Sequence, residues 1–260
     1  MVLITGGTSG IGLAVSELFL DLGYTVYSAS RKKREITKHN DFHCLNLDVS
    51  DLKAVRAFGP RFIEEFGVPE ILINNAGYGA FFEWGAFGED QIIDQANVLY
   101  LGPSLLCRTF APAMADARKG TIMNISSIAT LYPVPFMPIY NSAKSALSAL
   151  TFSLMLEYEK HPRFLDFRIG DVRTDFNKSS LQQDPSSQTC LMKSAWLQIE
   201  KQLNESPQAK VVASQILAAY KKNKQGIVYG GNFIQAKCAP LFHKILGQKG
   251  LRMLLHNRYQ

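Results

Sequence analysis

Cysteine is scarce in this chain. Four cysteines are scattered with no paired spacing, at Cys44, Cys107, Cys190 and Cys238. This excludes a disulfide-stapled secreted scaffold and predicts reduced thiols in a cytoplasmic protein. The five histidines form no cluster with these cysteines at metal-ligand spacing, so no metal site is expected.

Long apolar runs are also absent. No run reaches the roughly 18 residues of a transmembrane helix, so no integral membrane segment is expected. Met1 leads directly into an apolar stretch without a charged n-region, and no signal peptide is predicted. The net charge of +6 is modest and the basic residues show no nucleic-acid-binding pattern. A nucleic-acid partner is therefore not expected.

Short apolar segments alternate with amphipathic ones along the chain. Hydrophobic residues make up 47% of the 260 residues, and charged residues 19%, which suits one folded α/β domain over residues 1–260. Strands are predicted at 2–5, 24–29, 44–47, 71–73, 121–125, 165–169 and 227–229. Helices are predicted at 13–22, 51–66, about 87–108 and about 138–160. This order predicts a single-domain, Rossmann-type, doubly wound parallel sheet of about seven strands flanked by helices.

Periodicity weakens between residues 175 and 207, where polar residues increase. We interpret this segment as a mobile insert within the domain and not as a domain boundary.

A glycine-rich turn joins the first strand to the first helix. It reads Thr5-Gly6-Gly7-Thr8-Ser9-Gly10-Ile11-Gly12. Glycines at this place let the backbone approach a pyrophosphate, whose charge the helix N-terminus favours. The spacing differs from the G-x-G-x-x-G fingerprint, and a tight turn without a ligand is the alternative.

Cofactor choice is read after the second strand. A nucleotide with a free ribose 2′-hydroxyl would favour an acidic residue there, but the chain has Ser30-Arg31-Lys32-Lys33-Arg34. A guanidinium matches a 2′-phosphate in shape and charge. The segment therefore predicts NADP(H), with NAD(H) as the less favoured cofactor. A solvated basic loop is the alternative for Lys33 and Arg34.

Tyr140 and Lys144 are four residues apart in a predicted helix, 13 and 17 residues after Ser127. Their side chains leave the same helix face. A neighbouring ammonium stabilises a phenolate, so Tyr140 is a candidate acid/base for proton transfer at a carbonyl or alcohol oxygen. The spacing alone is weak, because chance copies occur in a chain with ten tyrosines.

From about residue 1 to 230 the chain resembles a classical short-chain dehydrogenase/reductase. The resemblance rests on motifs in the family's order and spacing. They are Thr5 to Gly12, Asp48-Val49, Asn74-Asn75-Ala76-Gly77, Asn97, Ser126-Ser127, and Tyr140 with Lys144.

This resemblance implies four catalytic residues. Tyr140 would be the acid/base, and Lys144 would lower its pKa and bind the nicotinamide ribose. Ser127 would hydrogen-bond the substrate oxygen and stabilise the charge developing there. Asn97 would hold a water that links Lys144 to solvent, although it could instead tie a helix to a neighbouring strand. Ser126 is interpreted as a structural turn residue.

The resemblance also implies a cofactor set. Asp48 would contact the adenine, unless it is a helix N-cap, and Thr8, Ser9 and Ile11 would contact phosphates. The whole set is Gly6, Thr8, Ser9, Gly10, Ile11, Gly12, Ser30, Arg31, Asp48, Val49, Asn75, Ala76, Gly77, Tyr140, Lys144, Val172 and Thr174.

Two positions depart from the family pattern. The family usually has Pro-Gly after the sixth strand, where this chain has Ile169-Gly170-Asp171. Loss of the proline removes a fixed φ and restores an amide donor beside the expected nicotinamide pocket. Ala129-Thr130 stands where a glycine often follows the two serines, which changes the expected substrate wall.

Bulky apolar residues surround these motifs. Tyr78, Phe136 and Phe176 are predicted to line a substrate pocket together with Ser127 and Tyr140. An apolar pocket suits a small hydrophobic carbonyl or alcohol substrate. The alternative is that several of these side chains belong to the core.

The tail from Lys237 to Gln260 contains basic and apolar residues but no acid. It could form a basic amphipathic helix that rests on a membrane surface. A lid over the substrate pocket or a subunit interface is favoured over this peripheral membrane contact. The family resemblance also implies a homodimer or homotetramer, with the helices around Asn97 and Lys144 at the interface.

The sequence thus predicts an NADPH-dependent oxidoreductase that reduces a carbonyl to an alcohol and can run in reverse. One alternative is a sugar-nucleotide epimerase of the family's extended branch. Another is a non-catalytic NADP-binding sensor or scaffold.

Overall fold

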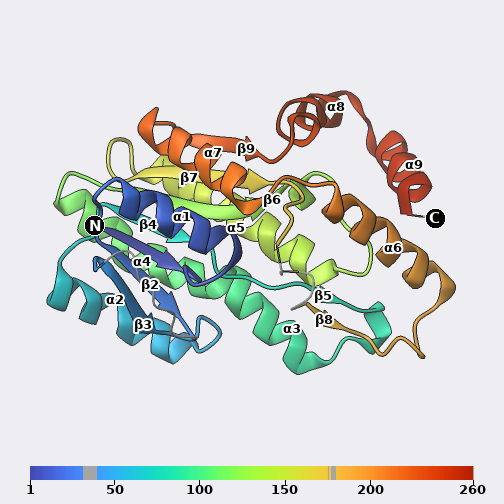
Figure 1. The fold of residues 1–260 in the computed structure, drawn as a ribbon, viewed down its shortest axis with the longest axis horizontal. Coiled ribbons are helices and arrows are strands. Elements are labelled where there is room, and N and C mark those ends of the chain that lie inside the picture. Colours follow the sequence, from blue (N-terminus) through green and yellow to red (C-terminus); the bar gives the residue numbers. More distant parts are fainter. Residues whose placement is uncertain (32–39, 175, 177–179, 260) are drawn as a thin grey trace.

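A computed structural model describes residues 1–31, 40–174, 176 and 180–259. Seven parallel strands form its central sheet, in the order β3-β2-β1-β4-β6-β7-β9 (Figure 1). Their bounds are β1 Val2–Thr5, β2 Val26–Ser30, β3 Phe42–Asn46, β4 Ile71–Asn74, β6 Thr121–Ser127, β7 Arg163–Ile169 and β9 Gly226–Gly230. The predicted single-domain, doubly wound parallel sheet is confirmed.

Helices cover both faces of the sheet (Figure 1). On one face lie α1 (Gly10–Asp21) and α7 (Ala209–Lys221). On the other lie α2 (Leu52–Phe66), α4 (Gly102–Asp116) and α5 (Pro138–Glu157). Successive strand side chains point to opposite faces, so Ile4 packs toward α1 while Leu3 packs toward α2 and α4. The central strands β1 and β4 are buried throughout, and they are apolar at every position except the last.

The helix expected from about residue 87 to 108 is divided into three segments. It begins with α3 (Glu89–Ala96), continues through a π-helical turn η2 (Asn97–Leu101), and ends in α4. Gly102 lies where α4 approaches the segment after β3, and a Cβ there would come within 2.4 Å of Val49 Cγ1. A larger residue at position 102 would therefore push α4 away from this segment.

The segment from 175 to 207 has more regular structure than its sequence pattern predicts. It contains β8 (Leu181–Gln182), which pairs with β5 (Ala80–Phe81), and the 15-residue helix α6 (Cys190–Asn204). Met192, Ala195 and Ile199 of α6 are buried. The interpretation of this segment as a mobile insert stays a prediction. Helix α6 itself was not expected, because its narrow apolar stripe finds partners far away in the chain.

The tail does not form the single helix considered from its sequence. It consists of a π-helical turn η4 (Ile234–Cys238), then α8 (Ala239–Ile245) and α9 (Gln248–Tyr259). These elements lie at one end of the molecule, beyond the edge of the sheet (Figure 1, red). All three contact the body of the domain. The Ala239 carbonyl at the start of α8 accepts a hydrogen bond from the Tyr132 hydroxyl at 2.7 Å, and Gln235 of η4 bonds to Asp171. Tyr259 and Leu255 of α9 pack against α6. Short 3-10 turns occur at η1 (Trp84–Ala86) and η3 (Ile128–Thr130).

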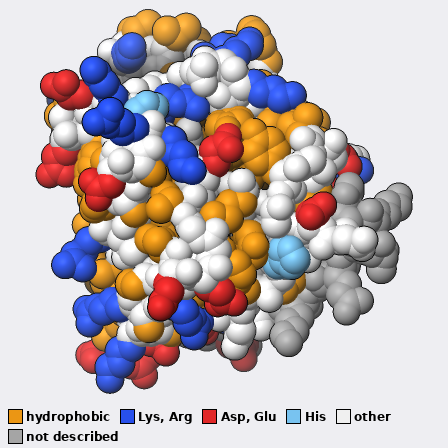
Figure 2. All heavy atoms as spheres, turned by 90° about the vertical axis from the view of Figure 1, so that its left-hand side faces the viewer, with side chains coloured by type: hydrophobic (Ala, Val, Ile, Leu, Met, Phe, Trp, Pro, Cys, Tyr) orange, Lys and Arg blue, Asp and Glu red, His pale blue; other side chains and the backbone are white. Residues whose placement is uncertain are grey.

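Three absences hold for the part of the chain that the structure describes. No helix there is long and apolar enough to span a bilayer. No group of three or more His, Cys, Asp or Glu side chains is placed to hold a metal ion. All four cysteines are free thiols. On the face shown in Figure 2, charges of both signs are interspersed with apolar side chains.

Candidate active site

The chain reverses its direction of travel across the sheet between β1 and β4, which lie side by side. Ligands of open α/β sheets bind in the crevice at such a switch point. Thr5 holds the two strand ends together here. Its Oγ1 accepts hydrogen bonds from the N–H groups of Asn75 and Ala76, both at 3.0 Å. The Asn75 amide also donates to the Thr5 carbonyl at 3.0 Å.

The glycine turn beside this crevice needs its glycines. Gly6 and Gly10 have φ values of +69° and +53°, in the left-handed region that glycine tolerates best. A Cβ on Gly12 would lie 2.2 Å from the Gly6 carbonyl oxygen. Ser9, the N-cap of α1, is exposed and makes no capping hydrogen bond with its side chain. The helix N-terminus is therefore available to an anionic group.

The side of the crevice that was expected to take the adenosine lies at the ends of β2 and β3. Ser30 ends β2, and the next side chain, Arg31, is 71% exposed with its guanidinium 4.0 Å from the Asp48 carboxylate. Asp48 accepts hydrogen bonds from the Ser50 N–H and hydroxyl, at 2.9 and 2.8 Å. Asp51, not Asp48, is the N-cap of α2, so the helix-cap alternative for Asp48 is wrong.

Of the basic run after β2, only Arg31 lies among the described residues. Lys32, Lys33 and Arg34 fall outside them.

Ser127, Tyr140 and Lys144 come together at the end of β6. Ser127 is the last residue of β6, and its Oγ accepts a hydrogen bond from the Ala129 N–H at 3.1 Å. The Tyr140 side chain lies near Ser127, close enough for the serine hydroxyl to influence the pKa of the phenol. Lys144, one turn further along α5, donates from Nζ to the Ile125 carbonyl at 2.6 Å. Its ammonium lies 5.9 Å from the centre of the Tyr140 ring.

Burial dominates the electrostatics of this group. It raises the pKa of Tyr140, an effect that the neighbouring Ser127 side chain opposes and the charge of Asp171 reinforces. Burial also lowers the pKa of Lys144 to about 8, against the opposing effect of Asp166. The family resemblance implied that Lys144 lowers the pKa of Tyr140, but here the net shift of Tyr140 is upward.

Asn97 stands at the start of η2. Its Nδ2 donates to the Ser50 carbonyl at 3.2 Å and ties this helix to the segment after β3. The structure thus contains the contact of the alternative interpretation, and the proton-relay role of Asn97 stays a prediction. Gly77 lies beside the catalytic lysine, because a Cβ there would come within 3.9 Å of Lys144 Nζ.

The segment after β7 carries the expected nicotinamide contacts. Val172 is buried, and Thr174 lies against the glycine turn, since a Cβ on Gly10 would be 3.8 Å from it. This segment is also hydrogen-bonded to the tail, a contact that was not expected from the sequence. Gln235 of η4 accepts from the Asp171 N–H at 3.2 Å and donates to the Asp171 carboxylate at 2.6 Å. The sequence signal was Asp171 itself, an acid directly after the Ile169-Gly170 that stands where the family usually has Pro-Gly.

The three predicted substrate residues occupy different places. The Phe176 ring meets Tyr140 edge-on, with centroids 6.2 Å apart. Phe136 packs edge-on against Phe81 and has a φ of +60°, a strained value for a phenylalanine. The Tyr78 hydroxyl donates to Asp94 of α3 at 2.6 Å, so its polar end is engaged away from the catalytic hydroxyls.

A pocket of about 520 Å³ opens next to this cluster. Its lining comes from the loop 133–136, from α6 and from the inner face of α9, and is mostly apolar. Phe136 and Tyr259, which line it, belong to the same packed cluster as Tyr140. The tail therefore covers one side of the cluster that contains Tyr140.

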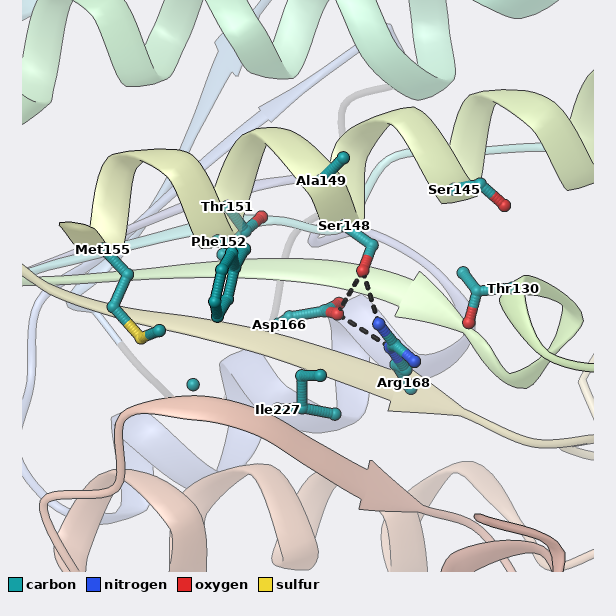
Figure 3. A pocket seen from close by; sticks show the side chains of 11 residues that line it. Thr130, Ser145, Ser148, Ala149, Thr151, Phe152, Met155, Asp166, Arg168 and Ile227 are labelled. Atoms are coloured by element: carbon teal, nitrogen blue, oxygen red, sulfur yellow. Dashed lines mark hydrogen bonds and ion pairs between the residues drawn. The ribbon is translucent and has the colours of Figure 1, made fainter. Parts of the chain in front are cut away.

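A second pocket, of about 310 Å³, lies between α5, β7 and β9 (Figure 3). At its floor Asp166 accepts from Ser148 at 2.6 Å and from Arg168 at 2.8 Å, and Arg168 also donates to Ser148 at 2.7 Å. Ser126 donates to the same carboxylate. Adjacent strand residues face opposite ways, so Ser126 points away from Ser127. This supports the structural interpretation of Ser126.

The model of the short chain dehydrogenase family matches residues 1–185. The chain belongs to this family. It is 33% identical over 185 residues to an uncharacterised oxidoreductase of Schizosaccharomyces pombe. It is 32% identical over 177 residues to the 3-ketodihydrosphingosine reductase of Bacteroides thetaiotaomicron. These matches span 70% and 68% of this chain, and 63% and 65% of the relatives, which is just under two thirds of their length.

Other matches extend over more of the molecule. The short-chain dehydrogenase ptmH of Penicillium ochrochloron is 31% identical over 245 residues, which is 88% of both chains. Among solved structures, a short-chain dehydrogenase from Streptomyces avermitilis superposes with a TM-score of 0.78 at 21% identity. The superposition covers 98% of this chain and 94% of that one, and it supports the fold described above.

Proposed function

We propose that this family member is an NADPH-dependent oxidoreductase that reduces the carbonyl group of a hydrophobic substrate to an alcohol and can run in reverse. The observation that carries the proposal is the meeting of Ser127, Tyr140 and the buried Lys144 at the end of β6, beside the crevice of the glycine turn. Neither the sensor nor the extended-branch epimerase is favoured by the site or by the family match.

The cofactor, when bound, supplies the hydride that attacks the carbonyl carbon. The residues of the chain position the oxygen and manage its proton. Because Tyr140 lies near Ser127, the two hydroxyls can contact one substrate oxygen. Ser127 donates a hydrogen bond to this oxygen as negative charge develops on it. Tyr140 then transfers its proton to the oxygen.

The pKa shifts suit the direction of reduction. A raised pKa keeps the Tyr140 phenol protonated at neutral pH, which is the form that an acid catalyst needs. Lys144, with a pKa of about 8, remains cationic at neutral pH and stabilises the phenolate left after proton transfer.

The residues around the crevice fit a phosphorylated dinucleotide. The uncapped α1 N-terminus and the glycine turn suit a pyrophosphate. Arg31 suits a ribose 2′-phosphate better than a free hydroxyl, because it is exposed and no acid stands at Ser30. Thr174 and Val172 lie close enough to this turn to border the nicotinamide end.

An apolar substrate is supported by the residues around Tyr140. Phe176 contacts its ring, and the mostly apolar pocket beneath α9 lies beside it. The Bacteroides relative is named a 3-ketodihydrosphingosine reductase, and this ketone belongs in the first substrate panel. The four free thiols support a cytoplasmic location. A homodimer or homotetramer, assembled through α4 and α5, completes the proposal.

The test is oxidation of NADPH and NADH by the purified protein with ketones, β-keto acyl compounds and aldehydes. Tyr140→Phe should lower turnover by about 10²–10⁴-fold while NADPH binding, measured by fluorescence, is retained. Tyr158→Phe, at the end of the same helix, is the matched control and should leave turnover unchanged. Turnover that survives in Tyr140→Phe would contradict the proposal.

A further inference from the structure

The tail, residues 233–259, leaves large apolar side chains uncovered. Seven of them are 46–82% exposed, namely Phe233, Ile234, Leu241, Phe242, Ile245, Met253 and Leu254. Scattered exposed apolar residues are common on protein surfaces, but a concentration of this kind in one short segment marks an interaction site.

These side chains have a common direction on each tail helix. On α8, Leu241 and Phe242 are four and three residues before Ile245, so all three share one face. On α9, Leu251, Leu255 and Tyr259 form the inner stripe that lines the apolar pocket, whereas Met253 and Leu254 are exposed. The tail therefore keeps an apolar outer face after its inner face is packed.

The charge around this outer face has one sign. No acidic residue follows Glu205, and residues 206–260 contain nine Lys and Arg. The first 205 residues contain 19 Lys and Arg against 22 Asp and Glu. Figure 2 shows charges of both signs mixed over a different face of the molecule. The excess positive charge of the chain is thus located in its last 55 residues, and five of the nine cations lie in the tail.

These features select the partner. A symmetric contact between two copies places the same patch on both sides, so the tail's lysines and arginines would face like charges. An anionic lipid surface offers negative headgroups for the cations and an acyl boundary for the apolar side chains. We propose that the tail docks the protein peripherally on anionic membranes.

Docking would also serve the proposed reduction of a hydrophobic substrate. The inner face of α9 lines the pocket beside Tyr140, and a helix with its side chains is only about 10 Å across. A substrate dissolved in the bilayer would therefore have a short path to the pocket. The docking proposal itself rests on the tail and not on the catalytic assignment.

The test is co-sedimentation of the full chain with vesicles of phosphatidylcholine alone or with added phosphatidylserine. Binding should require phosphatidylserine and should weaken as salt is raised. The double variant Phe242→Glu, Ile245→Glu should lose at least ten-fold in partitioning. Lys244→Gln and Lys249→Gln should each lose about five-fold. Trp84→Glu, at an equally exposed apolar site outside the tail, should bind as the wild type does.

Unfolding temperatures near the wild-type value would show that the variants fold. Equal binding to both vesicle types, or binding to neither, would overturn the proposal. So would a double variant that binds normally, or one that converts an oligomer into monomers in sedimentation analysis. Turnover of a water-soluble ketone by the double variant should equal that of the wild type, so docking and catalysis can fail separately.

Discussion

Lys144 is a buried cation at the centre of the site. Its pKa of about 8 lies below the ordinary lysine value of 10.5, so it loses its charge at a lower pH than a free lysine. The pKa of Tyr140 is shifted upward, so the phenol stays protonated over the same range. The rate of carbonyl reduction should therefore fall as pH rises through about 8.

A pH profile of kcat/KM checks this assignment. The Lys144→Arg enzyme should reduce the carbonyl more slowly, but its kcat/KM should no longer fall near pH 8, because a guanidinium keeps its proton. If kcat/KM of Lys144→Arg still fell near pH 8, the titration would belong to another group.

Arg31 tests the cofactor choice. Its contact with Asp48 is long and exposed, at 4.0 Å, so little is lost when the guanidinium turns to a phosphate. Charge-assisted hydrogen bonds contribute about 1.5–3 kcal/mol, so Arg31→Ala should weaken NADPH binding by roughly 10–100-fold and leave NADH binding nearly unchanged. Titration of both cofactors measures this. Arg61→Ala, on the exposed side of α2, is the control, and an equal loss for both cofactors would contradict the assignment.

At the scale of elements, the strands were easy to predict. The first strand was expected at 2–5 and is observed there, because a strand buried on both faces must be apolar throughout. The pairing of Tyr140 with Lys144 was equally accessible, since it depends only on helical spacing. Helix α6 was missed because its buried stripe is narrow. Its partners are Phe81 and Tyr259, more than 50 residues away in either direction.

The hydrogen bonds between Gln235 and Asp171 could not be predicted from the sequence, because 64 residues separate the two side chains. This contact connects η4 of the tail to the segment of Val172 and Thr174, where the family usually has a proline-fixed backbone. Gln235→Ala would leave a buried carboxylate without its donor. We expect a lower unfolding temperature together with a raised KM for the cofactor.

Gln215→Ala is the matched control for this variant. Gln215 also makes two hydrogen bonds, to the N–H and the carbonyl of Gly231 just before the tail, but it makes no hydrogen bond to residues 170–174. It should lose similar stability with an unchanged KM. If KM for the cofactor changed equally in the two variants, the Gln235 contact would only stabilise the fold and would not position the cofactor segment.

At the scale of the whole molecule, two of the regions with exposed apolar side chains bear on how the protein meets other surfaces. One is the outer face of the tail, and the other lies along α5 and the end of η2. There Phe152 and Leu156 are 53% and 67% exposed, and Leu101 is 38% exposed. Phe152 also forms a wall of the pocket above Asp166 and Arg168 (Figure 3). This second region lacks the excess of one charge sign that characterises the tail, so a symmetric contact there is not opposed by like charges.

We therefore expect assembly through α4 and α5, and lipid contact through the tail. Phe152→Glu places a charge in the expected subunit contact, where an unpaired charge is costly to bury. It should shift the sedimentation equilibrium from dimer or tetramer toward monomer. Phe242→Glu, an identical exchange on the tail, should leave the assembly intact. If Phe242→Glu dissociates the protein and Phe152→Glu does not, the assignment of assembly to α4 and α5 is wrong. The apolar face of α8 is then the surface that a second copy covers.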